Sequence, residues 1–302
     1  MPRRSSVIDH PRRERIDALL VAGDHSVAAI ARDLGVGVES LKRYARKRRD
    51  HDEPPRTLVG SSALETFERA FGLTPKPHQA TYLGETRPTI VIKGRQVGMT
   101  TGASGLAVHT ALSQPGSTSV IISPSLRQSG EVTDRARLAL WKWNAKRRQD
   151  SASLLRTAAG SRIISLPGSA RGIRGYACAL VIIDEAAWVD DETWQAARPL
   201  VAATGGRLIV QSTPGHAVGW FYDLVTDPPA DWAVLRVTSE EAGTIDPEFL
   251  ERERATMALE LFAQEYGAEF GSATVGTPLF TPERIETLFV DEVPPWQSTS
   301  AT

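Results

Sequence analysis

The chain has 302 residues, of which 41% are hydrophobic and 24% are charged, and its net charge is −1. This composition is that of a soluble globular protein and excludes a chain too polar to form a core. No apolar run approaches the roughly 20 residues of a membrane helix, and the N-terminus lacks the apolar stretch of a secretory signal. The single cysteine, Cys178, excludes an internal disulfide and cannot form a zinc site alone. We therefore expect a cytoplasmic protein with no membrane partner.

The charge is divided unevenly along the chain. Residues 1–50 contain twelve Lys/Arg and seven Asp/Glu, a net charge of +5, and the remainder carries −6. A basic N-terminal region on an acidic body indicates that this region meets a polyanion.

Residues 1–52 are predicted to form a small all-α domain. Apolar spacing and glycine stops predict helices over 12–23 and 26–36, and a third, basic helix follows a short turn. This order is typical of the helix-turn-helix, whose second helix contacts DNA. The residues expected to contact DNA are Lys42, Arg43, Arg46 and Lys47. A helical cap with a solvated basic face, or a bundle that docks a protein, is the alternative.

Residues 53–60 are rich in proline and polar residues and are predicted to be a linker, and the pattern then changes. Short Val/Ile-rich runs alternate with helical stretches from residue 61 to about residue 270. Continuous apolar strands suit burial on both faces, so this region predicts an α/β domain with a mainly parallel sheet flanked by helices. Residues 271–302 are predicted to be a loop-rich C-terminal tail.

A candidate phosphate-binding loop, "KGRQVGMTT", lies between a predicted strand and a predicted helix. The standard loop is G-x-x-x-x-G-K-[ST], in which backbone N–H groups and the helix N-terminus hold the phosphate. With Gly98 as the second glycine, Met99 occupies the lysine position and Thr100 the magnesium-binding position. Lys93 then opens the loop, from where its ammonium could reach the phosphates. A plain strand–turn–helix junction is the alternative for this stretch alone.

Two later strands end in residues that suit nucleotide chemistry. "LVIIDE" is a buried strand that ends in Asp184 and Glu185, which is the Walker B arrangement. There the Asp joins the magnesium shell and the Glu activates the attacking water. "LIVQSTP" ends in Ser212 and Thr213, whose hydroxyls could sense the γ-phosphate. An acidic helix start and an ordinary strand end are the alternatives.

In this order and spacing, the three motifs resemble the ATPase domain of the large terminase subunit, the DNA-packaging motor of tailed bacteriophages. "SLPGSARGIRGYACALVIIDEAAWV" and "LFAQEYGAEF" also resemble that family, and the likeness covers about residues 65–270. The resemblance implies an ASCE-type P-loop NTPase fold that uses ATP and Mg²⁺.

The family's roles carry over where residues match. Glu185, Lys93 and Arg95 would be catalytic, with Lys93 as the displaced loop lysine and Arg95 as an arginine finger or γ-phosphate sensor. Gln79 would read adenine, Thr100 and Asp184 would bind Mg²⁺, and Ser212 and Thr213 would couple hydrolysis to DNA movement. The nucleotide would contact Gln79, Lys93, Gly94, Arg95, Gln96, Val97, Gly98, Met99, Thr100 and Thr101.

The resemblance implies partners as well: double-stranded DNA, the portal protein, the small terminase subunit and further copies of the chain in a ring. Only residues 271–302 follow the matching region, so we expect no nuclease domain here and a separate nuclease chain as a further partner. Two other functions stay open. One is a non-catalytic DNA-binding adaptor with a degenerate nucleotide site, and the other is a helicase-like DNA-remodelling ATPase.

Overall fold

The computed structural model describes residues 16, 27–42, 61–143, 145 and 147–272. The predicted linker at 53–60 lies outside these residues, as do most of the predicted helix at 12–23, the tail after residue 272 and the predicted DNA contacts Arg43, Arg46 and Lys47. Lys42 is described and exposed, and its ammonium lies 2.9 Å from the carboxylate of Glu39.

The described part of the N-terminal region contains two helical stretches joined by a tight turn. α2 (Val27–Asp33) ends before Gly35, and residues 38–42 are helical again. Gly35 has a φ of 69°, a left-handed conformation that a glycine adopts without a steric penalty. Ile16, Ile30 and Leu41 are buried together. The order helix, glycine turn, helix agrees with the predicted helix-turn-helix pattern.

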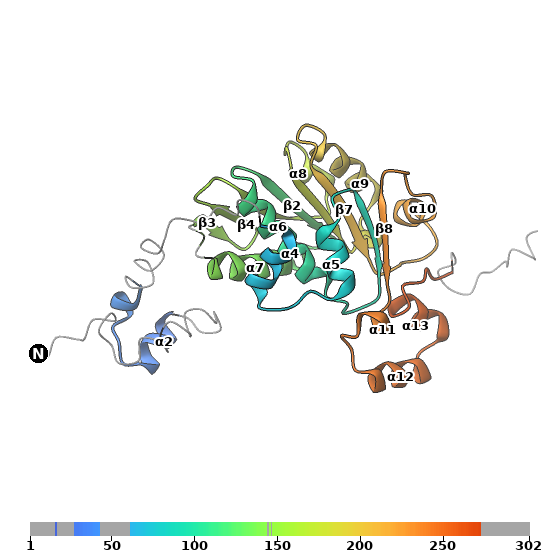
Figure 1. Ribbon diagram of the computed structural model, residues 1–302, viewed down its shortest axis with the longest axis horizontal. Helices are drawn as coiled ribbons and strands as arrows, with labels where there is room; N and C mark the ends of the chain where they lie inside the picture. Colours follow the sequence, from blue (N-terminus) through green and yellow to red (C-terminus); the bar gives the residue numbers. More distant parts are fainter. Residues whose placement is uncertain (1–15, 17–26, 43–60, 144, 146, 273–302) are drawn as a thin grey trace, which may run out of the picture.

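A single eight-stranded sheet forms the centre of the α/β region, in the order β3-β4-β5-β2-β6-β7-β1-β8 (Figure 1). Every pairing is parallel except those of β4, which runs antiparallel to both β3 and β5. The strands are β1 (Thr89–Lys93), β2 (Thr118–Ser123), β3 (Arg147–Ser151), β4 (Leu154–Thr157), β5 (Arg162–Pro167), β6 (Leu180–Asp184), β7 (Arg207–Ser212) and β8 (Ala233–Val237). The predicted mainly parallel sheet is confirmed.

The parallel strands were readable from the sequence, whereas the β3–β4 hairpin was not. All residues of β1, β2 and β6 are buried, which is why these strands appear as unbroken apolar runs. β3 has the sequence RRQDS, which carries no apolar alternation. Its place at the edge of the sheet is determined by its pairing with β4.

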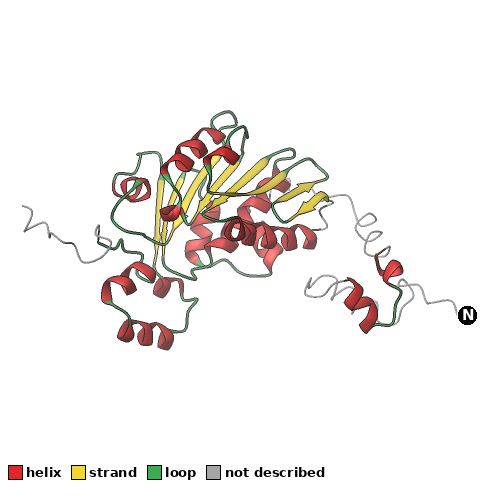
Figure 2. Ribbon diagram, turned by 180° about the vertical axis from the view of Figure 1, so that it is seen from behind, coloured by secondary structure: helices red, strands yellow, loops and turns green. Residues whose placement is uncertain are grey.

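Helices cover both faces of the sheet (Figures 1 and 2). One face packs against α4 (Ala63–Phe71), α5 (Pro77–Gly84), α6 (Met99–Ser113) and α7 (Leu126–Lys142). The other packs against α8 (Ala170–Ile173), α9 (Asp191–Ala197), α10 (Trp220–Thr226) and the 3₁₀ turns η2 (Ala186–Trp188) and η3 (Arg198–Val201). Cys178 is buried on this second side, and burial raises the pKa of its thiol to about 11, as expected of an inert structural cysteine.

A group of short helices follows β8 and lies beyond one end of β1 and β8 (Figure 1). It comprises α11 (Ser239–Ala242), α12 (Pro247–Thr256) and α13 (Leu259–Glu265). None of the helices in the described ranges is long and apolar enough to span a membrane.

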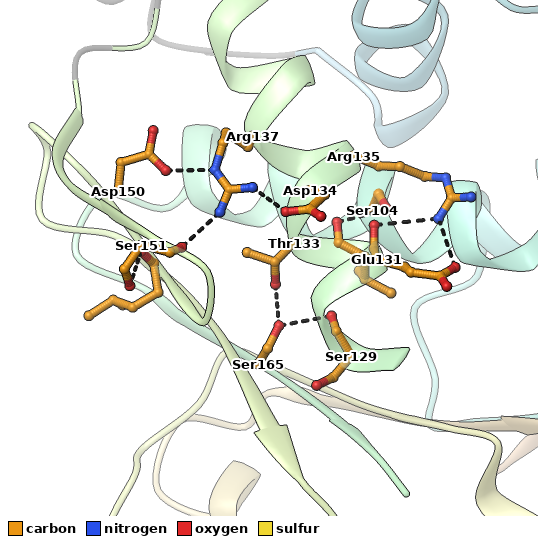
Figure 3. A network of polar contacts seen from close by, with 12 residues as sticks. Ser104, Ser129, Glu131, Thr133, Asp134, Arg135, Arg137, Asp150, Ser151 and Ser165 are labelled. Atoms are coloured by element: carbon orange, nitrogen blue, oxygen red, sulfur yellow. Dashed lines mark hydrogen bonds and ion pairs between the residues drawn. The ribbon is translucent and has the colours of Figure 1, made fainter. Parts of the chain in front are cut away.

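Polar contacts fasten α7 to the edge of the sheet (Figure 3). Arg137 on α7 donates 2.6 Å to the carboxylate of Asp150 and 2.7 Å to the carbonyl of Ser151, both on β3. The hydroxyl of Ser165 on β5 donates 2.8 Å to the carbonyl of Ser129 on α7. The β3–β4 hairpin is therefore held by directional bonds where it has few apolar residues to bury.

Candidate nucleotide site

Three adjacent strands bring the predicted motifs to one edge of the sheet. β7 pairs with β6 on one side and with β1 on the other, and all three run parallel. Their carboxyl ends therefore meet at the same edge, which is where open α/β sheets bind ligands. The loop after β1 connects to α6, whose first residue is Met99. The loop and Asp184 are far apart in the sequence, but only one strand lies between them in the sheet.

The loop from Gly94 to Gly98 adopts the backbone shape that a phosphate loop needs. Gln96 has a φ of 57° and Gly98 a φ of 79°, both in the left-handed region. Left-handed residues among right-handed ones turn successive N–H groups toward a common point, which forms an anion-binding concavity. The loop leads directly into the N-terminus of the fifteen-residue helix α6, whose dipole favours an anion.

The loop is also bonded to the α11–α13 group. The Gly94 amide donates 2.8 Å to the carbonyl of Val237, and the Arg95 amide donates 2.8 Å to the carbonyl of Glu265. The hydroxyl of Ser239 donates 2.7 Å to the carbonyl of Arg95. A Cβ atom on Gly94 would clash with the Ser239 hydroxyl and would lie 2.5 Å from the Tyr266 carbonyl. The motif glycine is thus required by the close approach of another part of the backbone.

Gly94→Ala should disrupt this junction and lower the free energy of unfolding by about 1–3 kcal/mol, the usual cost of overpacking. It should also weaken nucleotide binding, because the loop must move to accommodate the methyl group. Thermal unfolding and the binding of a fluorescent ATP analogue measure the two effects. Gly130→Ala is the matched control, since nothing lies within 4 Å of a Cβ at Gly130 within α7. Equal behaviour of the two variants would contradict the crowding seen at Gly94.

Lys93 and Glu185 are brought together at this edge. The Lys93 ammonium lies 3.0 Å from Oε1 of Glu185, and the lysine side chain is only 9% exposed. Glu185 has a φ of 54°, an uncommon conformation for a residue other than glycine, and such strain clusters at functional sites. A γ-phosphate would compete with this carboxylate for the lysine ammonium. The entrance lysine of the loop and the predicted general base are thus in direct contact.

Asp184 is held from two sides. Its Oδ1 accepts hydrogen bonds from the amide of Glu185 (3.1 Å) and from Nε2 of Gln211 (2.9 Å). Burial raises the pKa of the Asp184 carboxyl, and the neighbouring Lys93 and the bond from Gln211 oppose that rise. Both bonds that the carboxylate accepts end at Oδ1, so Oδ2 has no donor among the described residues and suits a cation.

The end of β7 contacts the turn that follows β6. The hydroxyl of Ser212 accepts from the amide of Ala187 at 3.2 Å, and the hydroxyl of Thr213 donates to Oε2 of Glu185 at 3.4 Å. Both predicted coupling residues therefore touch the segment that carries the candidate base. A displacement of Glu185 would therefore change its hydrogen bond with Thr213.

Gln79, which we expected to read adenine, is bonded to the loop. Its Nε2 donates 2.9 Å to the carbonyl of Gly98, and its Oε1 accepts from the amide of Lys76 at 2.9 Å. The neighbouring His78 contributes Nε2, which lies 2.8 Å from the carbonyl of Val97 and must carry the proton because a carbonyl only accepts. The pair clamps the loop, and adenine recognition by Gln79 would require that its bond to Gly98 open. The role of His78 was missed, because histidine followed by glutamine gives no distinctive signal.

The other loop residues differ in what they present. The guanidinium of Arg95 forms an ion pair with Glu265 on α13, and its side chain is 58% exposed. Met99 is the first residue of α6. It is 2% exposed and its side chain lies in the core, so only its backbone N–H can face a phosphate. The hydroxyls of Thr100 and Thr101 have no hydrogen-bond partner in the described part of the chain. Both are in the first turn of α6, where a hydroxyl can reach a cation or a phosphate.

These residues fit a magnesium ion that arrives with a nucleotide. Mg²⁺ in such sites keeps one or two protein oxygens plus substrate phosphates and water, and does not need a cage of protein ligands. Asp184 would supply a carboxylate oxygen, Oδ2, and Thr100 would supply a hydroxyl. Among the described residues no cluster of three His, Cys, Asp or Glu side chains could hold a metal by itself.

A sequence profile of the family described as "Terminase large subunit, T4likevirus-type, N-terminal" matches residues 90–286, which is more than half of the chain. The chain belongs to this terminase large subunit family. The match includes the loop and the strands β6 and β7. The resemblance inferred from the motifs is thereby confirmed.

Individual terminases agree with this assignment. The large terminase subunit of Thermus virus P23-45 is 27% identical over 240 residues, which cover 65% of this chain and 49% of that protein. The ATPase domain of the Thermus phage P74-26 large terminase superposes with a TM-score of 0.62 at 23% identity, covering 70% of this chain and 99% of that one. A large terminase from a thermophilic bacteriophage, solved in complex with ADP, gives a TM-score of 0.54 at 13% identity, covering 69% and 52%. The chain spans about half the length of the curated relatives it matches.

A second concave feature of this terminase chain lies on the face of the sheet opposite α6. A pocket of about 290 Å³ is bordered by η2, by the segment after β7 and by Phe270, and its aromatic lining includes Trp188, Trp220 and Tyr222. Its polar lining residues include Asp191 and His216. Its lining includes neither a residue of the loop at 94–98 nor a Lys or Arg side chain.

Proposed function

We propose that this chain is the ATP-hydrolysing subunit of a DNA-packaging motor, which moves double-stranded viral DNA into a procapsid. The observation that carries the proposal is that Lys93, Asp184 and Glu185 lie together beside a loop with the backbone shape of a phosphate-binding loop. Membership of the terminase family supports the coupling of this chemistry to DNA. The partners that fit are DNA, the portal protein, the small terminase subunit and other copies of the chain in a ring.

In this proposal each group at the site has a separate role in phosphoryl transfer. The loop amides after Arg95 and the α6 N-terminus hold the β- and γ-phosphates, and Lys93 neutralises charge that develops on the transferred group. Mg²⁺, held by Thr100 and Asp184, supplies further charge neutralisation when it is bound. Glu185 orients and deprotonates the attacking water. Thr213 is bonded to the carboxylate of Glu185, so it can respond to the loss of the γ-phosphate.

Three observations favour a working site over a degenerate one. A buried lysine stands at the loop entrance, 3.0 Å from the candidate base, whereas the standard lysine position holds a methionine. Asp184 and Glu185 are both present and both fixed by hydrogen bonds. Glu185 also keeps a strained backbone, a feature that persists only where the surrounding structure imposes it.

The decisive experiment measures ATP turnover by the full chain with and without double-stranded DNA, at low and moderate salt. We expect turnover that DNA increases, with less stimulation as salt rises, since each phosphate contact releases a counterion. A variant with alanine at Lys42, Arg43, Arg46 and Lys47 should keep basal turnover and lose most of the DNA stimulation. DNA binding without any ATP turnover would instead indicate the non-catalytic adaptor. ATP-dependent strand separation would indicate the helicase-like alternative.

A further inference from the structure

Gln211 is a polar residue in the interior of the sheet that the proposed mechanism has not used. It lies on β7 between the loop strand and the strand of the candidate base, paired in register with Val91 on β1 and with Asp184 on β6. Its side chain is 0% exposed. A buried amide in a central strand is uncommon and calls for a physical reason.

The nitrogen and the oxygen of this side-chain amide differ in their hydrogen bonding. Nε2 donates a 2.9 Å hydrogen bond to Oδ1 of Asp184. Oε1 is buried and has no hydrogen-bond partner among the described residues. Flipping the amide would not help, because it would set Oε1 against the carboxylate oxygen of Asp184. A buried carbonyl oxygen without a donor costs free energy, because it has lost its hydrogen bonds to water.

The contact with Asp184 gives Gln211 a role at the site. Oδ1 is fixed by Gln211 and by the Glu185 amide together, so the carboxylate cannot rotate, and the other oxygen keeps one direction. Partners that orient a metal-binding carboxylate in this way are typical of metal sites and affect metal affinity strongly. The next two residues of the chain, Ser212 and Thr213, fix Ala187 and Glu185. Three consecutive residues, the last two of β7 and Thr213 after it, thus bond to Asp184, Ala187 and Glu185.

We infer that Gln211 is a positioning residue for Mg²⁺, which aims the carboxylate of Asp184 at the nucleotide-bound ion. The inference rests on the proposed function, in which Asp184 is the metal ligand. It differs from that function in assigning a role to a residue to which the sequence motifs gave none.

The test replaces Gln211 with methionine, which has a similar volume and neither the donor nor the unsatisfied oxygen. The full chain is titrated with Mg²⁺ in the presence of a fluorescent ADP analogue, and thermal unfolding is followed without nucleotide. We expect Gln211→Met to raise the Mg²⁺ concentration for half-saturation about tenfold. Its Tm should show that the variant is folded, and nucleotide affinity in EDTA should be unchanged.

Ser119→Ala is the matched control. Ser119 is also 0% exposed with an unsatisfied hydroxyl, but it pairs with Leu180 at the other end of β6. It should keep or raise Tm and leave the Mg²⁺ titration unchanged. Gln211→Asn is the second variant, because its shorter side chain keeps an amide that no longer reaches Asp184. It should shift the Mg²⁺ titration in the same direction as Gln211→Met.

An unchanged Mg²⁺ titration in either folded variant would overturn the inference. Failure of the proposed function looks different: the wild type itself would show no Mg²⁺-dependent nucleotide binding. The experiment therefore separates the role of Gln211 from the identity of the site.

Discussion

Lys93→Met should lower kcat for ATP hydrolysis about 100- to 1,000-fold, the usual loss when one preorganised charge or donor is removed from a transition state. The side chain is buried beside Glu185 and faces the edge where the phosphates would lie. Methionine keeps its length and volume, so the loss reflects the missing charge and not a cavity. Steady-state phosphate release and thermal unfolding together measure the effect.

Met99→Leu is the matched control, since it alters the residue at the standard lysine position. It should leave kcat within about threefold of the wild type and cost less than about 1.5 kcal/mol of stability, as a volume-conserving change does. Met99→Ala is unsuitable because Met99 is a core residue, and truncation there would cost about 2–5 kcal/mol. If Lys93→Met were active and Arg95→Ala inactive, the result would mean that Arg95, and not Lys93, binds the γ-phosphate.

Glu185→Gln should abolish turnover, with kcat reduced about 100- to 10,000-fold, the usual contribution of a general base. Nucleotide binding should persist and become tighter for ATP than in the wild type. The reason is that a neutral amide competes less well than a carboxylate for the Lys93 ammonium, which the γ-phosphate needs. Phosphate release in a single turnover gives the first effect, and equilibrium binding of ATP and ADP gives the second.

Glu192→Gln makes the same chemical change on the exposed surface of α9 and should leave both quantities unchanged. Unaltered turnover in Glu185→Gln would refute the general base. Weaker ATP binding in that variant would instead mean that the Lys93–Glu185 pair does not compete with the phosphate. The ADP measurement is an internal reference, because ADP has no γ-phosphate.

Much of the fold could be read from the sequence because its signals are local. The unbroken apolar runs of β1, β2 and β6 reflect burial on both faces and predicted the parallel sheet. The acidic pair at the end of β6 and the glycine-bearing loop after β1 occupy the strand ends where the sequence placed them. The β3–β4 hairpin was missed because an edge strand held by charged contacts has no apolar pattern.

Within the candidate site, the sequence identified Lys93, Asp184 and Glu185 by their positions next to apolar strands. It could not show that Arg95 pairs with Glu265 or that Gln79 is bonded to Gly98. Nor could it identify Gln211, since a glutamine before Ser212 has no distinctive signal of its own. Each of these contacts joins residues far apart in the chain.

The sequence by itself determined the class of fold, the family and the side chains available for phosphate chemistry, because strand burial and strand-end motifs depend on near neighbours. Only the tertiary structure decided how the loop "KGRQVGMTT" is used. It buries Met99 in the core, directs Lys93 to Glu185, and closes Gly94 against Ser239. The physical reason is the strand order: β7 lies between β1 and β6, and this arrangement determines which distant side chains meet.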